Sequence, residues 1–364
     1  MHFLPYLIAS VVAQEQLHLS LTGTQSSGIN KTMAFRTNVS FPYAHNSGFA
    51  VLPSGRVAVV FQASPSHEGV AEQVIMLSTS DDGGATFSSA RVIGGTGRAA
   101  AWGPVAFADG ALLRVFYAQS RATTPTALCG DIFHIASPDG GLSWTAPELA
   151  LSLEAWGGGT KCTDNKPAQI GENQWGIPFM AVSRGAAPAG LLASAPGAGM
   201  AGPWTPLAGR VQTPPHFNAT DYLSEPAVAS CAVAPGTYEM VTLLRNYERT
   251  WASRSYDGGA SWGAPFETPL ANPYSKVDLA VWLSYTQRGP QTGALLLAHN
   301  PVANCSKPTY CARTPLCVSW SQDCGTVWSR PLLLESTEES PRGASYRASA
   351  SSPFTLAPAR KRAR

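Results

Sequence analysis

The sequence predicts an all-β fold, a six-bladed β-propeller, from three observations. A turn motif recurs at a nearly constant spacing along most of the 364 residues. Each period contains four short apolar or alternating segments, and none of them has the apolar spacing of a helix. Glycine and proline are abundant, at 34 and 29 residues, which suits many short strands joined by tight turns.

The N-terminal segment is typical of a secretory signal peptide. Residues 1–13 form a short apolar run that ends in Val11-Val12-Ala13, a small-residue ending suited to cleavage before Gln14. Because its only positive groups are the amino terminus and His2, a buried first strand is the alternative interpretation. We expect a signal peptide over residues 1–13 and a secreted protein.

Glycosylation sequons and cysteines agree with secretion. The four sequons begin at Asn30, Asn38, Asn218 and Asn304. The chain has seven cysteines, so one is left unpaired. One or two local disulfides are expected among the four that lie within twenty residues, Cys305, Cys311, Cys317 and Cys324. No histidine lies among them, so their spacing is not that of a zinc site, and we expect no metal and no cofactor.

Composition argues against two classes of partner. Charged residues make up 13% of the chain and the formal net charge is +2, so no broad basic surface for nucleic acid is expected. No apolar run has the length of a membrane span, so we expect no stable membrane insertion.

The recurring turn, here called an Asp box, has the form Ser-x-Asp-x-Gly-x-Thr/Ser-aromatic. Its aspartates are 57, 118 and 66 residues apart, so a copy without its aspartate is expected near residue 200, where Trp204 supplies the aromatic side chain. We expect the aspartate to accept hydrogen bonds from the turn's own amides, the glycines to adopt positive φ, and the aromatic ring to pack between sheets. These residues are therefore interpreted as structural. The four copies begin at Ser80, Ser137, Ser255 and Ser321.

Each period predicts the four strands of one blade. In the first period these are Ser47–Leu52, Arg56–Ala63, Gln73–Ser78 and Thr86–Ile93. The first two strands of the next four blades are Pro104–Phe107 with Leu112–Ala118, Ala168–Ile170 with Gly176–Val182, Ala227–Ala232 with Tyr238–Leu244, and Leu279–Leu283 with Gly293–Ala298.

A sixth blade must be assembled from both chain ends. Leu17–Leu21 alternates as an edge strand and is expected to close the ring. After Tyr346 the expected strand is replaced by a serine-rich segment, so the last blade is predicted to be incomplete. We expect the propeller to cover residues 14–346 and residues 347–364 to be a basic, disordered tail.

These motifs resemble the Asp-box (BNR-repeat) sialidases, and especially their bacterial-type sialidase-like relatives, over roughly residues 36–346. The resemblance implies a six-bladed propeller with an axial site. In that family three arginines hold the carboxylate of sialic acid, a tyrosine assisted by a glutamate is the nucleophile, and an aspartate is the general acid/base.

The resemblance implies roles for four residues of this chain. Glu225, in Ser224-Glu225-Pro226, is similar to the glutamate that assists the tyrosine, and Tyr346 is similar to the nucleophile. Arg245 and Arg313 stand where the second and third arginines are expected.

Two positions depart from the family pattern. His45 stands in the register of the first arginine, because the nearby Arg36 is out of register. In the loop that carries the family's aspartate this sequence has His67-Glu68-Gly69, so Glu68 or His67 must substitute. The sialidase-like relatives share both features, which indicates a glycan chemistry other than, or broader than, sialic acid release.

Strand order predicts that the candidate residues meet. In an antiparallel blade the start of strand one, the end of strand two and the start of strand three lie at one rim. His45 and Glu225 precede first strands, Arg245 ends a second strand and Arg313 precedes a third, whereas the Asp boxes fall at the other rim. Each residue alone has a plainer interpretation, such as a surface arginine or, for Tyr346, a half-buried strand residue.

The leading functional prediction is an exo-glycosidase that hydrolyses terminal sialic acid or another acidic sugar from glycans. Its catalytic residues would be Tyr346, Glu225 and Glu68, and its substrate-binding residues Arg245, Arg313 and His45. The alternatives are a non-catalytic glycan-binding propeller and a structural module that presents loops to a protein partner.

Overall fold

The structure is a computed structural model that describes residues 32–121, 128–183, 187–217, 223–234, 237–282, 285–286, 289–290, 294–303, 305 and 311–336. Within these ranges the regular elements are all strands, as the sequence predicts, and no helix is present that could cross a membrane. The strands are β1 (Tyr43–Val51), β2 (Val57–Ser64), β3 (Val74–Ser80), β4 (Arg91–Gly94), β5 (Ala101–Asp109), β6 (Leu112–Gln119), β7 (Asp131–Ser137), β8 (Glu148–Leu151), β9 (Thr160–Thr163), β10 (Ala168–Gly171), β11 (Gln174–Val182), β12 (Ala189–Ser194), β13 (Trp204–Pro206), β14 (Ser224–Ala234), β15 (Thr237–Arg245), β16 (Tyr247–Ser255), β17 (Phe266–Pro273), β18 (Asp278–Trp282), β19 (Tyr285–Thr286), β20 (Gly289–Pro290), β21 (Ala294–His299), β22 (Leu316–Ser321) and β23 (Leu332–Glu335).

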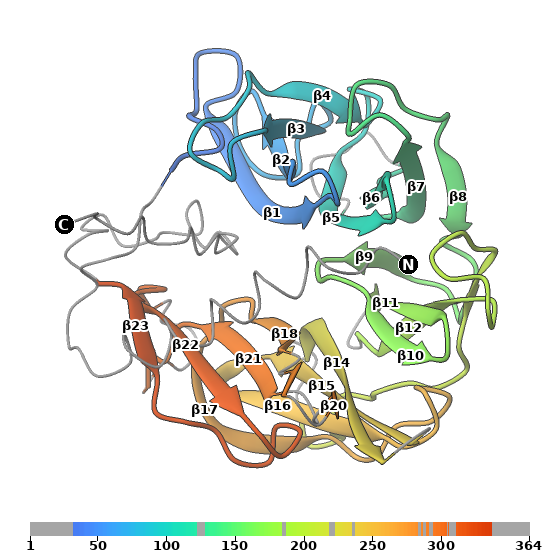
Figure 1. Cartoon of the computed structure of the whole chain (residues 1–364), viewed down its shortest axis with the longest axis vertical. Coiled ribbons are helices and arrows are strands. Elements are labelled where there is room, and N and C mark those ends of the chain that lie inside the picture. The colour runs from blue at the N-terminus through green and yellow to red at the C-terminus, as the bar shows by residue number, and fades with distance from the viewer. Residues whose placement is uncertain are drawn as a thin grey trace.

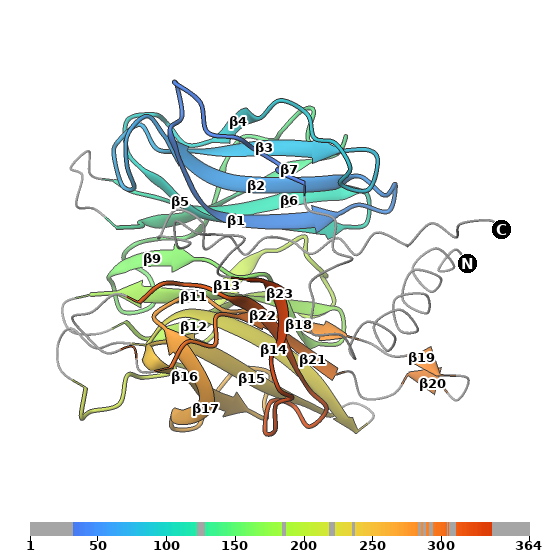
Figure 2. The same ribbon diagram turned by 90° about the vertical axis from the view of Figure 1, so that its left-hand side faces the viewer.

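The strands form five antiparallel blades arranged around a central axis (Figure 1). The blades are β1-β2-β3-β4, β5-β6-β7-β8, β10-β11-β12-β13, β14-β15-β16-β17 and β18-β21-β22-β23, and β19-β20 is a separate small hairpin. Seen from the side, β1, β2 and β3 run next to one another across the width of the molecule (Figure 2). This is the β-propeller that the sequence predicts, with five blades in the described residues; the segments expected to form the sixth lie outside them.

The third blade differs from the predicted plan at its inner edge. Both β9 and β10 pair with β11, so the inner strand is interrupted by residues 164–167. The sequence predicts only the β10 part of this strand. Asp164 lies in this interruption and lines the pocket between the blades.

The Asp boxes have the predicted geometry. In the first, Asp82 accepts hydrogen bonds from the amide of Thr86 at 2.9 Å and from the hydroxyl of Thr86 at 2.6 Å. Gly83 and Gly84 have φ values of 69° and 92°. These hydrogen bonds, led by that of the Thr86 hydroxyl, hold the pKa of Asp82 well below its usual range.

The aromatic residues of the later boxes pack between neighbouring blades, as predicted. Trp144 lies against the core between the first two blades, Trp204 between the second and third, and Trp328 between the fourth and fifth. Trp262 lies in the core between the third and fourth blades. The apolar core is therefore a series of wedges, each formed by two adjacent sheets.

Two of the three disulfides join neighbouring blades. Cys129–Cys162 links the connection before β7 to β9, and Cys231–Cys324 links β14 to the Asp box of the fifth blade. Cys305–Cys311 is the local disulfide that the sequence predicts, and the unpaired cysteine is Cys317, which is buried. The sequence left the pairing of Cys324 open, and its partner Cys231 lies 93 residues away in the sequence.

Candidate functional site

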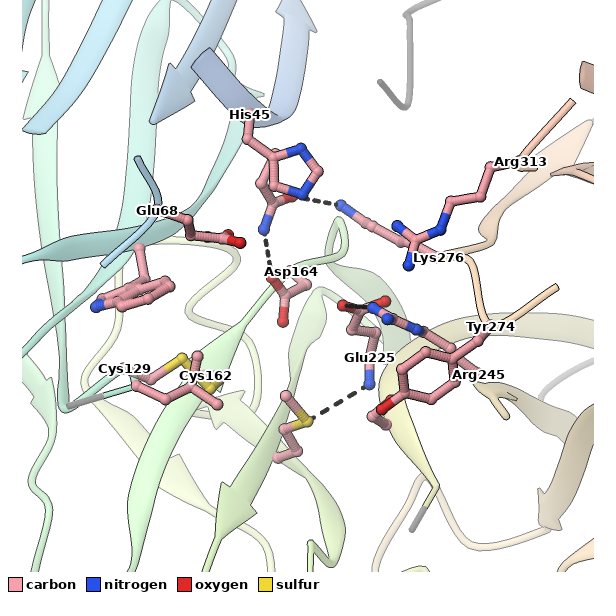
Figure 3. Close-up of a pocket in the computed structure, with 16 residues that line it drawn as sticks. His45, Glu68, Cys129, Cys162, Asp164, Glu225, Arg245, Tyr274, Lys276 and Arg313 are labelled. Carbon is pink, nitrogen blue, oxygen red and sulfur yellow. Dashed lines mark hydrogen bonds and ion pairs between the residues drawn. A yellow bond between two sulfur atoms is a disulfide. The ribbon is translucent and has the colours of Figure 1, made fainter. Parts of the chain in front are cut away.

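One pocket between the blades contains five of the six residues singled out from the sequence (Figure 3). These residues come from the first, fourth and fifth blades and are His45, Glu68, Glu225, Arg245 and Arg313. The sixth, Tyr346, lies outside the described residues. The Asp boxes lie at the other end of the strands. The C-terminal end of β2 pairs with β1 near His45, through Gln62 and Ala63, whereas its N-terminal residue Val57 pairs with Ser80, where the first Asp box begins.

Local irregularities of the strands turn these side chains inward. A register shift follows His45 in β1, and another lies between Ser224 and Ala227 in β14. Bulges of this kind redirect a side chain away from the regular alternation of a strand. Of the eight non-glycine residues with positive φ in the described ranges, four line the pocket, namely Asn46, Cys129, Glu225 and Tyr274. Such concentration of unfavourable backbone conformations is common at functional sites.

One side of the pocket is cationic. Arg245 and Arg313 are only 4% and 5% exposed, and together with Lys276 they enter the pocket from the side opposite Glu68 (Figure 3). The guanidinium of Arg245 lies 3.8 Å from the ring centroid of Tyr274, which in turn stacks on Tyr247 at 4.0 Å. This cation–π stack fixes the plane of the guanidinium.

Glu225 is the anionic partner of Arg245. Its Oε1 accepts a hydrogen bond from Arg245 Nη1, whereas its buried Oε2 has no hydrogen-bond partner within the described part of the chain. Burial favours the neutral acid, but the positive charge and hydrogen bond of Arg245 outweigh it and hold the pKa of Glu225 below its usual range. Glu225 is thus a carboxylate with one oxygen available to a ligand or a neighbouring hydroxyl.

Glu68 lies on the opposite wall. Its Oε1 accepts a hydrogen bond of 2.8 Å from Gln62, whose own Oε1 accepts one of 3.0 Å from the amide of Gly103. Burial raises the pKa of Glu68, and the nearby negative charge of Glu225 adds to this rise. Glu68 therefore holds its proton to higher pH than an ordinary glutamate.

His45 supplies no positive charge at neutral pH. Burial lowers its pKa to about 4, and the charges of Arg313, Lys276 and Arg245 act in the same direction. The pocket therefore contains a neutral imidazole where the sequence comparison expected a substitute for an arginine.

Sequence reasoning missed Asp164, Lys276 and Tyr274, which also line the pocket. Lys276 Nζ donates a hydrogen bond of 3.1 Å to Asn46 Oδ1, and Asn46 Nδ2 donates one of 2.5 Å to Asp164 Oδ1. Burial, together with the charge of Glu225, raises the pKa of Asp164 well above its usual range. The only feature of the sequence that could have identified them is their position: Asp164 and Lys276 come just before the first strand of a predicted blade, as His45 and Glu225 do.

The remaining wall is largely apolar. It contains Trp102, Leu128, Met180 and the Cys129–Cys162 disulfide. Trp102 Nε1 is tied by a hydrogen bond of 3.0 Å to Ser120 Oγ, so the indole is fixed. The pocket thus has a cationic side, two half-buried carboxyl groups with raised pKa values, one carboxylate and an apolar side. Such a set suits an anionic, partly apolar ligand and the transfer of protons.

Comparison with known proteins agrees with the fold. The model of the BNR repeat-like domain matches residues 55–354. The Hadza microbial sialidase Hz136 superposes with a TM-score of 0.62 at 15% identity, over 81% of this chain and 59% of that one. The NanB sialidase from Streptococcus pneumoniae gives a TM-score of 0.63 at 11% identity, over 88% of this chain and 65% of that one. A leech intramolecular trans-sialidase gives 0.61 at 13% identity, again over 88% and 65%.

These identities are low, so the superpositions show a shared fold and not a shared activity. The chain spans 59% to 65% of the length of the three sialidases. No curated protein sequence matches the chain. The domain match nevertheless covers more than half of the residues, in agreement with the Asp boxes and the blades, so the chain belongs to the BNR repeat-like, sialidase-like family of β-propellers.

Proposed function

We propose that the protein is a retaining exo-glycosidase that removes a terminal acidic sugar, sialic acid in the first instance, from glycans. The observation that supports this most strongly is that His45, Glu68, Glu225, Arg245 and Arg313, chosen by sequence register, line a single pocket. The choice of sialic acid is supported by the structural neighbours, of which two are sialidases and one is a trans-sialidase complexed with 2,7-anhydro-Neu5Ac.

Arg245 and Arg313 bind the carboxylate of the sugar in this proposal. A guanidinium presents two parallel N–H donors to the two oxygens of a carboxylate, which gives both affinity and orientation. The low exposure of both arginines strengthens these hydrogen bonds, because little water competes for them. Neutral His45 contributes a hydrogen bond to the sugar and not a charge.

Tyr346 is the nucleophile and Glu225 its base. The phenol oxygen bonds to the anomeric carbon while Oε2 of Glu225 takes the phenol proton, and Glu68 gives its proton to the departing glycosidic oxygen. Water then attacks the same carbon, Glu68 takes the proton of that water, and the tyrosine oxygen leaves and recovers its proton from Glu225. The configuration of the sugar is retained, because the anomeric carbon is displaced twice.

A neutral nucleophile is appropriate for this substrate. The anomeric carbon of an acidic sugar of this type bears a carboxylate, which repels an anionic nucleophile. The protonation states required of the carboxyl groups agree with their environments. Burial raises the pKa of Glu68, which acts as the acid, and Arg245 holds down the pKa of Glu225, which acts as the base.

The same proposal includes a complete propeller in a secreted protein. Residues 17–21 and the segment that contains Tyr346 would form a sixth blade and bring the tyrosine to the pocket, and residues 1–13 would be removed as a signal peptide. The two disulfides between blades support an oxidising compartment.

The test is hydrolysis of a fluorogenic panel that contains an α-sialoside, a β-glucuronide and a neutral β-galactoside. We expect turnover of an acidic glycoside, the sialoside first, and none of the galactoside. Tyr346→Phe is expected to lose nearly all of this turnover, whereas a variant that keeps it would exclude Tyr346 as the nucleophile.

A non-catalytic glycan-binding propeller is the second candidate. It is favoured by one observation, the neutral His45 in the place of a family arginine. Binding of sialylated glycans on an array, with no turnover of any acidic glycoside, would select this function over the first.

A further inference from the structure

Lys276 is a pocket cation that the sequence comparison with sialidases does not explain. We infer that Lys276, held in place by Asn46 and Asp164, is a third cationic ligand of the substrate carboxylate, so that it supplies the charge that neutral His45 lacks. This inference rests on the proposed function, since it concerns how that pocket binds an acidic sugar.

The position of Lys276 fits this role. It lines the pocket together with Arg245 and Arg313, and the three side chains enter from the same side (Figure 3). The charges of all three reach His45, where each lowers the pKa of the imidazole. A carboxylate bound beside His45 would therefore be in the field of three cations.

The ammonium group is fixed without a direct ion pair in the described residues, although its charge acts on the nearby Glu225. Its one hydrogen bond within the described residues goes to the amide oxygen of Asn46, at 3.1 Å, which leaves two N–H donors. No carboxylate of the described residues lies within ion-pair distance of Lys276 Nζ. Lys166, which lines the neighbouring cavity, differs in this respect because it pairs with Asp278 at 3.1 Å.

Asp164 explains how a lysine so close to an acid keeps its charge unpaired. Asn46 lies between the two, accepting from Lys276 and donating to Asp164 Oδ1 at 2.5 Å. Burial and the neighbouring Glu225 raise the pKa of Asp164, so this carboxyl group resists ionisation. Burial raises the pKa of Asp164 to about 7, so below that pH the protonated Asp164 orients the Asn46 amide without cancelling the ammonium charge, and that charge remains for the ligand.

If Lys276 had a purely structural role, its substitution would have different effects on stability and ligand binding. The chain Lys276–Asn46–Asp164 joins the fifth, first and third blades, so its loss would lower stability and affect every ligand alike. If Lys276 instead binds the substrate carboxylate, its substitution weakens the binding of acidic substrates only. The effect then depends on the charge of residue 276 and not on its hydrogen bond to Asn46.

The experiment compares Lys276→Gln, Lys276→Met and Lys276→Arg with the full-length wild type. Lys276→Gln removes the charge and keeps an N–H donor, on a side chain one bond shorter. We expect its KM for an α-sialoside to rise roughly 10- to 100-fold, the value of a charge-assisted hydrogen bond, with kcat changed by less than about threefold. Lys276→Met should show a similar increase of KM, and Lys276→Arg should keep most of the wild-type affinity. Lys166→Met is the matched control and should leave KM unchanged.

The outcomes separate the two proposals. If wild type neither cleaves an acidic glycoside nor binds free sialic acid by calorimetry, both the proposed function and this inference fail. If wild type is active and Lys276→Gln, folded by its circular dichroism and melting temperature, has an unchanged KM, only the role of Lys276 fails. An equal increase of KM in Lys276→Gln and Lys276→Arg would also overturn the proposed role of Lys276, because a structural role would then explain the result.

Discussion

At the scale of single residues, Asp164 is the acidic group joined to Lys276 through the Asn46 amide. The groups that face it are Glu225 on β14, Arg245 on β15, Lys276 before β18 and Asn46 on β1, and the Lys166–Asp278 pair lies in the cavity behind it. When Asp164 ionises, it adds a negative charge beside Lys276 and repels an acidic substrate. In the proposed function its protonated form, which its raised pKa extends to higher pH, is therefore the form expected to bind substrate.

We therefore expect the KM of wild type for an acidic glycoside to increase as pH rises through the raised pKa of Asp164. Asp164→Asn is always neutral and keeps an amide beside Asn46, so it should remove this increase while preserving binding at low pH. The measurement is KM against pH for both proteins. Parallel profiles for wild type and the variant would exclude Asp164 as the controlling group.

Gly103 sets the distance between the second and third blades at the pocket. Its φ is 53°, and a Cβ at this position would lie 1.9 Å from the carbonyl oxygen of Thr163, a backbone atom that cannot move aside. Gly103→Ala is expected to cost about 3 kcal/mol of unfolding free energy or more.

The control is Gly97→Ala, which has a φ of 66° but nothing within 4 Å of the new Cβ. It bears only the penalty for positive φ, on the order of 1 kcal/mol. Urea unfolding of both variants checks this, and equal losses would mean that the close approach at Gly103 is not a constraint.

At the scale of elements, the repeated features of the fold could be predicted from the sequence, whereas features that depend on contacts between blades could not. The Asp boxes, the blade strands and the rim position of Glu225 and Arg245 follow from a local period and from strand order. The interruption between β9 and β10 and the Cys231–Cys324 disulfide do not, because β9 also contacts the second blade and the disulfide joins the fourth blade to the fifth. Asp164 and Lys276 were missed for the same reason, since only the closed arrangement brings them together through Asn46.

The Asp box is a stabilising element remote from the pocket. Asp82 accepts three hydrogen bonds within the turn, whereas its neighbour Asp81 makes an exposed ion pair with Arg56. We expect Asp82→Ala to lower the melting temperature by a few degrees and Asp81→Ala to change it little, because exposed ion pairs contribute little.

Neither of these substitutions should change KM for the substrate once the protein is folded. Differential scanning calorimetry and kinetics on the same samples separate the two effects. A change of KM in Asp82→Ala at a temperature well below melting would contradict a purely structural role for the Asp box.

At the scale of the whole molecule, buried histidines make the fold sensitive to acid. His299 is 1% exposed, and burial lowers its pKa from 6.5 to about 4. The unfolded chain therefore takes up a proton below about pH 6.5 that the folded chain resists until about pH 4. The stability that neutral His299 confers is complete above pH 6.5 and is lost as pH falls toward 4.

The loss amounts to about 3 kcal/mol across this window for one histidine. His299→Gln does not titrate, so the difference in unfolding free energy between pH 7.5 and pH 4.5 should be smaller in this variant than in wild type. Guanidinium unfolding at the two pH values measures it. The same difference in both proteins would show that His299 titrates normally in the fold.

The central claim is that this propeller cleaves acidic sugars by double displacement. It is tested most directly by following the hydrolysis of an α-sialoside by wild type with proton NMR and identifying the anomer of free sialic acid that appears first. We expect the α-anomer first, followed by slow mutarotation to the β-anomer, because attack by Tyr346 and then by water retains configuration. The β-anomer as the first product, or no release of sialic acid at all, would contradict the claim.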